Sequence, residues 1–170
     1  MRIRPDEEIF VDLPPSPALL YLLEDLLTVR HDLRVDPILA DRWSCDSERC
    51  RPVLGHNLCC KVETRCRHLG DGACTIHDDK PLDCALFPVD LVRVAGVRVV
   101  TTAKNMAFFD TGWCRFDRDM LRCFDGEERG AQTMFQVQRA LLERLFTRAE
   151  VKAMARTLAA VAPGVAWQQE

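Results

Sequence analysis

The stretch from Cys66 to Thr102 reads CRHLGDGACTIHDDKPLDCALFPVDLVRVAGVRVVTT and contains two contrasting patterns. Its first part, up to Pro88, is rich in cysteine, glycine, proline and charge and has neither a helical nor a strand period. Its second part alternates valine with arginine on both sides of Ala95-Gly96, which predicts two strands joined by a tight turn at Gly96. The sequence therefore predicts one β-hairpin, directly after a segment that ordinary burial does not hold in place.

Seven of the nine cysteines in the chain fall within the forty residues that end at Cys84. These seven are Cys45, Cys50, Cys59, Cys60, Cys66, Cys74 and Cys84. Nine is an odd number, so the cysteines cannot all pair within the chain. Charged Arg2, Arg4 and Asp6 interrupt the start of the chain, where a secretory leader would be apolar, and the longest apolar run, Ala18–Leu23, is far short of a membrane span. We therefore expect a cytoplasmic protein without a membrane partner, in which clustered cysteines bind metal more often than they form disulfides.

Cysteine thiolates suit zinc and iron–sulfur clusters, because both centres take tetrahedral sulfur ligation. No C-x2-C pair occurs in the chain, which argues against a zinc finger and against a thioredoxin-like dithiol. Seven cysteines exceed the four that one centre needs, so either two centres are present or some of the cysteines are only buried. His77, three residues after Cys74, and Cys114 remain open as further ligands.

The second half of the cysteine segment has a more specific arrangement. The turn residues Asp71-Gly72 predict that Cys66 and Cys74 come together on the two arms of a small hairpin. The spacing of the cysteines resembles the YkgJ-type cysteine-cluster family of zinc- or iron-chelating domains. The residues that carry this resemblance are Cys59-Cys60, Cys66, Leu69, Gly72, Cys74, Ile76, Lys80-Pro81, Cys84 and Phe87-Pro88. The resemblance implies metal binding through these cysteines, and one similar family, the flagellin lysine N-methylases, transfers methyl groups.

Length and composition indicate a single domain over residues 1–170, with a cysteine-cluster segment at 42–88 and a C-terminal helical element at 127–162. The chain is 48% hydrophobic and 29% charged, which is enough apolar material for a core. Its formal net charge of −3 argues against a nucleic-acid partner, because phosphate binding requires a basic surface.

Helices are expected at both ends of the chain. Ser16-Pro17 has the pattern of an N-cap followed by proline at the first helical position, and leucines then predict a helix over Ala18–Arg30 that is buried in the core. A second helix is predicted over Glu127–Phe146, with a buried face formed by Met134, Val137, Leu141, Leu142 and Leu145. Thr147 and Glu150 have the spacing of a capping box, which predicts a third helix ending at Val161.

Together these patterns predict an α+β fold with helices at both ends, one β-hairpin and an irregular, cysteine-rich, metal-bound core. The function that they favour is a metal-binding protein that holds zinc or an iron–sulfur cluster. Two alternatives stay open: an iron–sulfur-dependent group-transfer or redox enzyme of the methylase kind, and a zinc-stabilised protein-interaction module. The sequence contains no G-x-S-x-G, H-E-x2-H or Walker motif.

Overall fold

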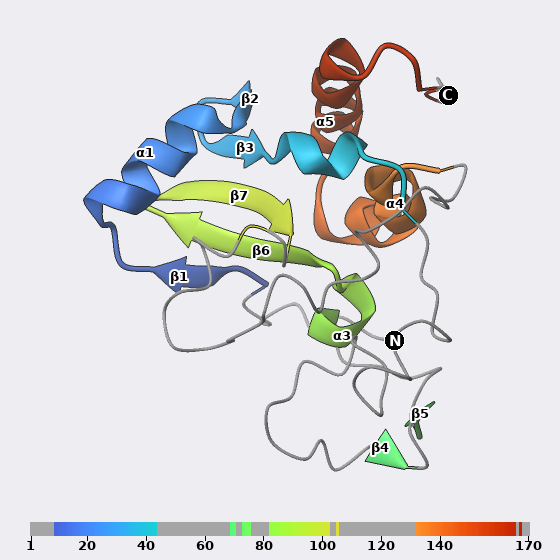
Figure 1. The fold of residues 1–170 in the computed structure, drawn as a ribbon. Helices are drawn as coiled ribbons and strands as arrows, with labels where there is room; N and C mark the ends of the chain where they lie inside the picture. Colours follow the sequence, from blue (N-terminus) through green and yellow to red (C-terminus); the bar gives the residue numbers. More distant parts are fainter. Residues whose placement is uncertain are drawn as a thin grey trace.

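The structure is a computed structural model that describes residues 9–43, 69–70, 73–75, 82–102, 105, 132–165 and 167. A five-stranded mixed sheet lies at its centre, with the strand order β1-β6-β7-β3-β2 (Figure 1). The strands are β1 (Val11–Leu13), β2 (Leu27–Arg30), β3 (Leu33–Val35), β6 (Val89–Val94) and β7 (Val97–Thr102). The predicted α+β class is therefore confirmed, whereas most of the predicted cysteine-rich core lies outside the described residues.

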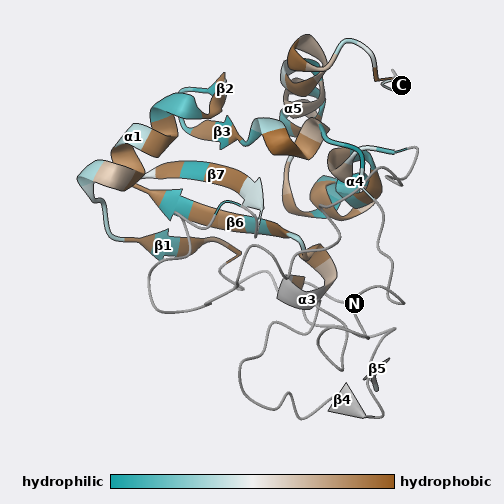
Figure 2. Cartoon of the chain, in the orientation of Figure 1, coloured by the Kyte–Doolittle hydropathy of each residue, from teal (hydrophilic) through white to brown (hydrophobic). Residues whose placement is uncertain are grey.

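The predicted hairpin forms the middle of this sheet. Strands β6 and β7 pair antiparallel in continuous register, from Val94 opposite Val97 to Val89 opposite Thr102. The turn between them is made by Ala95 and Gly96, whose φ angles of 49° and 81° are both in the left-handed region. Two successive positive φ values are typical of the tight turn that matches the twist of a hairpin. Hydrophobic residues follow most of the length of both strands (Figure 2).

Three further strands extend the hairpin on both sides, and the sequence analysis missed all of them. Strand β1 runs parallel to β6 and lies before the predicted N-cap Ser16. Strand β3 runs parallel to β7, and β2 pairs antiparallel with β3 on the outer edge. These strands are three or four residues long, too short to show an alternating pattern, and their positions depend on pairing with the distant hairpin.

The leucine-rich helix is shorter than predicted. Helix α1 (Pro17–Asp25) begins as expected, because the Ser16 hydroxyl accepts a hydrogen bond from the Leu19 amide at 3.2 Å. It ends at Asp25 rather than at Arg30, since the residues from Leu27 onward form strand β2. Pairing with β3 outweighs the helical pattern of the leucines in this part of the chain.

Burial of the leucine-rich helix is also only partial. Leu19 is buried, but Leu20 and Tyr21 on the same helix are 45% and 72% exposed. The helix therefore contributes to the core as expected through one face, which includes Leu19, but its apolar face is narrower than the leucines predicted.

The C-terminal helices are α4 (Met134–Leu145) and α5 (Arg148–Val161). Both begin with a capping box, formed in α4 by Thr133 with Gln136 and in α5, as predicted, by Thr147 with Glu150. Because Thr133 is the N-cap, α4 does not extend back to Glu127 as the sequence suggested. Its buried face is also rotated from the prediction: it contains Phe135 and Gln138, while Val137 is 41% exposed.

Two hydrophobic clusters lie on opposite faces of the sheet. Alternate residues of β6 divide between them, with Val89 and Leu91 in the larger cluster and Val92 and Val94 in the smaller. The larger cluster is completed by α4, α5 and the 3-10 helix η1 (Pro37–Ala40), and the smaller one by α1. Helix α1 lies well apart from α4 and α5 (Figure 1). In the described part of the chain, no helix is long and apolar enough to cross a membrane.

Candidate metal centre

The structure describes the chain around two of the seven predicted ligands. Cys74 lies in strand β5 (Ala73–Cys74), and Cys84 lies in helix α3 (Leu82–Leu86). The other five, Cys45, Cys50, Cys59, Cys60 and Cys66, lie outside the described residues, as do His77 and Cys114. The side chains of Cys74 and Cys84 are also not described, so the predicted ligation remains a prediction at all seven positions.

The small hairpin predicted around Cys74 is present. Strand β4 (Leu69–Gly70) pairs antiparallel with β5, with Leu69 opposite Cys74 and Gly70 opposite Ala73. This pairing brings the chain back on itself between the two strands, as the turn residues Asp71-Gly72 predicted. Whether Cys66 approaches Cys74 stays a prediction, because Cys66 lies outside the described residues.

Helix α3 fixes the backbone of Cys84 against the core. Leu82 and Leu86, at the two ends of this helix, are 6% and 3% exposed, and the helix packs against β6. The buried Gln138 amide of α4 donates hydrogen bonds to the carbonyl oxygens of Ala85 at 3.5 Å and Phe87 at 3.2 Å. This single turn of helix is too short to show a period, which explains why the sequence analysis treated it as irregular.

The chain up to Trp43, the last described residue before Cys45, is also anchored by hydrogen bonds to α4 and its N-terminal flank. The Trp43 amide donates a hydrogen bond to the Gln132 carbonyl at 3.0 Å, and the Met134 amide donates one to the Asp41 carbonyl at 3.0 Å. The Trp43 side chain is 5% exposed. Its indole Nε1 is buried and, among the described residues, has no hydrogen-bond acceptor.

Both ends of the cysteine segment therefore lie in the same hydrophobic cluster. Trp43, two residues before Cys45, belongs to the larger cluster, and so do Leu82 and Leu86 on either side of Cys84. The described residues on the two sides of 44–81 are thus fixed in one core. Fixing both ends lowers the entropy that has to be lost when ligands from the two ends meet at one site.

The described residues contain no group of three or more His, Cys, Asp or Glu side chains close enough to hold a metal ion. Since no cysteine side chain is among those described, this result concerns only carboxylates and histidines elsewhere in the molecule.

Three charged groups with shifted pKa values form a cluster between the sheet and α5. Arg98 Nη2 on β7 donates hydrogen bonds to Asp32 Oδ2 at 2.8 Å and to Glu150 Oε1 at 2.7 Å. Asp32 lies in the turn between β2 and β3, and Glu150 lies in the first turn of α5. Arg30 Nη1 lies 3.6 Å from the same Glu150 oxygen. This Arg98 cluster ties α5 to the sheet.

Hydrogen bonding sets the charge states in the Arg98 cluster. The hydrogen bond from Arg98 holds the pKa of Asp32 below its usual value. Burial acts to raise the pKa of Glu150, but hydrogen bonds from Arg98 and Thr147 outweigh it and the pKa lies below the usual value. Burial likewise acts to lower the pKa of Arg98, yet hydrogen bonds to Glu150 and Asp32 leave it raised. Each group is charged and partnered at neutral pH, which is typical of a structural ion pair.

A second buried carboxylate, Asp36, connects η1 to the sheet. Its side chain accepts hydrogen bonds from the Ile38 amide at 3.0 Å, the Thr101 hydroxyl at 2.8 Å and the Asn105 amide at 3.3 Å. The sequence analysis missed Asp36 and the Arg98 cluster, because their partners are far apart in the chain. The only local indication was the capping-box spacing of Thr147 and Glu150.

Comparisons with models of protein families, with curated proteins and with solved structures found no match to this chain.

Proposed function

We propose that this protein binds zinc or an iron–sulfur cluster through the cysteines of residues 42–88, with Cys66, Cys74 and Cys84 as central ligands. The observation that carries the proposal is the concentration of seven thiols in forty residues. The proposal includes a location in the reducing cytoplasm. Thiols stay reduced there and are available as thiolate ligands. The resemblance to the YkgJ-type cysteine-cluster family supports the same chemistry.

The arrangement of the described backbone supports this proposal. Cys84 sits on a helix that is packed on β6, and the cysteine segment begins at Trp43, which is anchored in the same core. Cys74 sits on a paired hairpin strand. A metal ion needs ligands held in a fixed geometry by their surroundings, and backbone positions fixed by packing and pairing meet that need better than an unpaired loop.

Trp43 gives a further reason to expect ordered structure in the cysteine segment. A buried N–H without an acceptor costs about 1–3 kcal/mol, so native proteins rarely leave one unpaired. Trp43 itself lies two residues before Cys45. A metal-bound thiolate near Trp43 would supply such an acceptor.

Metal analysis of protein purified without oxygen tests the proposal. We expect a stoichiometric content of zinc, or of iron with acid-labile sulfide. A brown protein would favour the redox or group-transfer alternative, and a colourless zinc protein would favour a structural or interaction role. Protein that is free of metal and still fully folded would refute the proposal.

Substitution of single cysteines tests which of them are ligands. Replacing Cys66, Cys74 or Cys84 by serine should sharply lower the bound metal, because serine supplies no thiolate. The matched control is Cys123→Ser, which removes a thiol outside the cysteine segment and should leave the metal content unchanged. Equal losses at all four positions would show that the proposed separation of ligands from other cysteines is wrong.

A further inference from the structure

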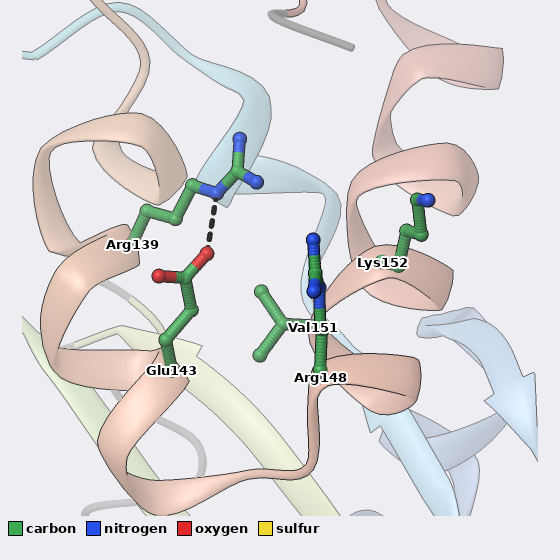
Figure 3. Close-up of a pocket in the computed structure, with 5 residues that line it drawn as sticks. All are labelled: Arg139, Glu143, Arg148, Val151 and Lys152. Carbon is green, nitrogen blue, oxygen red and sulfur yellow. Dashed lines mark hydrogen bonds and ion pairs between the residues drawn. The ribbon is translucent and has the colours of Figure 1, made fainter. Parts of the chain in front are cut away.

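A pocket at the junction of α4 and α5 contains charged residues that the proposed metal centre does not use. It has a volume of about 370 Å³ and is lined by Arg139, Glu143, Arg148, Val151 and Lys152. Figure 3 shows that Arg139 and Glu143 reach it from α4, while the other three residues come from α5. Val151, which is buried, lies between Glu143 and Arg148 and forms an apolar wall of the pocket (Figure 3).

The charge of this pocket is strongly positive, in contrast to the chain as a whole. Three cationic side chains and one carboxylate line it, whereas the complete chain has a formal net charge of −3. Arg148 and Lys152 are one helical turn apart, so they project from the same side of α5. Arg148 is the first residue of α5, where the helix dipole adds to the positive potential.

Glu143 orients one of the cations without neutralising the pocket. Its Oε1 accepts a hydrogen bond from Arg139 Nε at 2.8 Å, an interaction between residues one turn apart on α4. Binding through Nε fixes the plane of the guanidinium group, which lies on the α4 side of the pocket, while Arg148 lies on the α5 side (Figure 3). Guanidinium and ammonium groups are the side-chain donors that most often bind phosphate oxygens in proteins. The pocket contains two guanidinium groups and one ammonium group.

We propose that this pocket binds the phosphate group of a small phosphorylated molecule. Because three cations and the carboxylate of Glu143 leave the lining with two excess positive charges, a dianion balances it and a single carboxylate does not. The volume lies within the range of small-molecule sites and leaves room for an organic group beside the phosphate. A nucleic acid fits less well, because its binding needs an extended basic surface and the chain is acidic overall.

Isothermal titration of the purified protein of residues 1–170 with inorganic phosphate and with glycerol phosphate, at fixed ionic strength, tests this proposal. We expect saturable binding of glycerol phosphate. Lys152→Gln should weaken it about tenfold, the effect of losing one charge-assisted hydrogen bond. Glu143→Gln should tighten it, because the carboxylate repels the dianion.

The matched control is Arg156→Gln, which removes the same charge from an exposed position on α5, one turn beyond Lys152 and outside the pocket. It should change the dissociation constant less than about twofold, since an exposed charge at that distance is screened. Equal weakening by Lys152→Gln and Arg156→Gln would mean non-specific attraction and would overturn the proposal. Undetectable binding of both phosphates would overturn it as well.

The two titrants distinguish the sources of the phosphate group. Tighter binding of glycerol phosphate assigns the pocket to an organic phosphate, and binding of inorganic phosphate alone assigns it to the free ion. The pocket proposal is independent of the proposed metal centre, because none of the pocket residues is a cysteine. Its failure would therefore leave the expected metal content unchanged.

Discussion

The sheet with its helices and residues 44–81 of the cysteine segment differ in the forces available to hold them. The sheet and helices bury many apolar side chains completely, among them Leu33, Phe135 and Leu142. The cysteine segment has few aliphatic residues and is dominated by cysteine, histidine, glycine and charge. The first region therefore follows from ordinary hydrophobic packing, while the second is expected to depend on metal coordination. The comparison suggests that one chain contains two separately stabilised parts.

Removal of the metal should have the largest effect and should separate the two regions. Ordering a residue costs roughly 1–2 kcal/mol of backbone entropy, and a structural zinc site supplies on the order of 10–16 kcal/mol of apparent binding energy. With chelator, amides between Cys59 and Cys84 should lose protection from hydrogen exchange, while amides around Leu141 should keep most of theirs. Uniform protection in both conditions would mean that ordinary packing holds the cysteine segment.

A cavity in the core should destabilise the sheet and helices without changing the metal content. Leu142→Ala removes a fully buried side chain from α4 and should lower the free energy of unfolding by about 2–5 kcal/mol. The metal content of the folded protein should not change. Val137→Ala on the same helix removes a side chain that is 41% exposed and should cost less than about 1 kcal/mol. A loss of metal from folded Leu142→Ala protein would show that the two regions are not separately stabilised.

Acid should weaken the attachment of α5 to the sheet. The pKa values of Asp32 and Glu150 are lower in the folded protein than their usual values of 3.8 and 4.5. Their contribution to stability is therefore complete above about pH 4.5 and is lost as the pH falls through the lowered pKa values. The raised pKa of Arg98 has no effect in this range, because a guanidinium group stays protonated throughout it.

Chemical denaturation between pH 3 and pH 7 measures this dependence. Glu150→Gln should lower the free energy of unfolding at pH 7 by about 1–3 kcal/mol and flatten its fall toward acid. Glu143→Gln, which removes an exposed carboxylate paired with Arg139, should leave the acid dependence nearly unchanged. An identical pH profile for Glu150→Gln and the unchanged protein would contradict the assigned role of Arg98.

The turn of the central hairpin should show the smallest effect. Gly96 has a φ of 81°, a conformation that costs an alanine about 1–2 kcal/mol. A Cβ at this position would meet no atom within 4 Å, so the expected loss in Gly96→Ala is backbone strain alone. Gly164→Ala has similar open space without a positive φ and should be close to neutral in thermal unfolding. Equal melting temperatures for the two variants would argue against this explanation.

Local interactions explain the parts of the fold that the sequence predicted correctly. The β6–β7 turn needed Gly96, the start of α1 needed Ser16 and Pro17, and the start of α5 needed Thr147 with Glu150. Each of these features involves residues at most three positions apart. The small hairpin around Asp71-Gly72 was predicted for the same reason. For the metal centre, the sequence predicted the ligand type and the candidate cysteines, and these assignments stand as the proposal.

Contacts between distant parts of the chain decided the remainder. Residues 27–30 form a strand rather than the end of a helix, because β3 is available to pair with them and is itself fixed by β7. The buried face of α4 includes Phe135 and Gln138, since the Gln138 side chain donates hydrogen bonds to the carbonyl oxygens of Ala85 and Phe87. The Arg98 cluster and the α4–α5 pocket likewise bring together residues from separate elements. The sequence of one element shows its hydrophobic period. Which strand or helix its residues pair with or pack against depends on distant segments, so only the tertiary structure determines it.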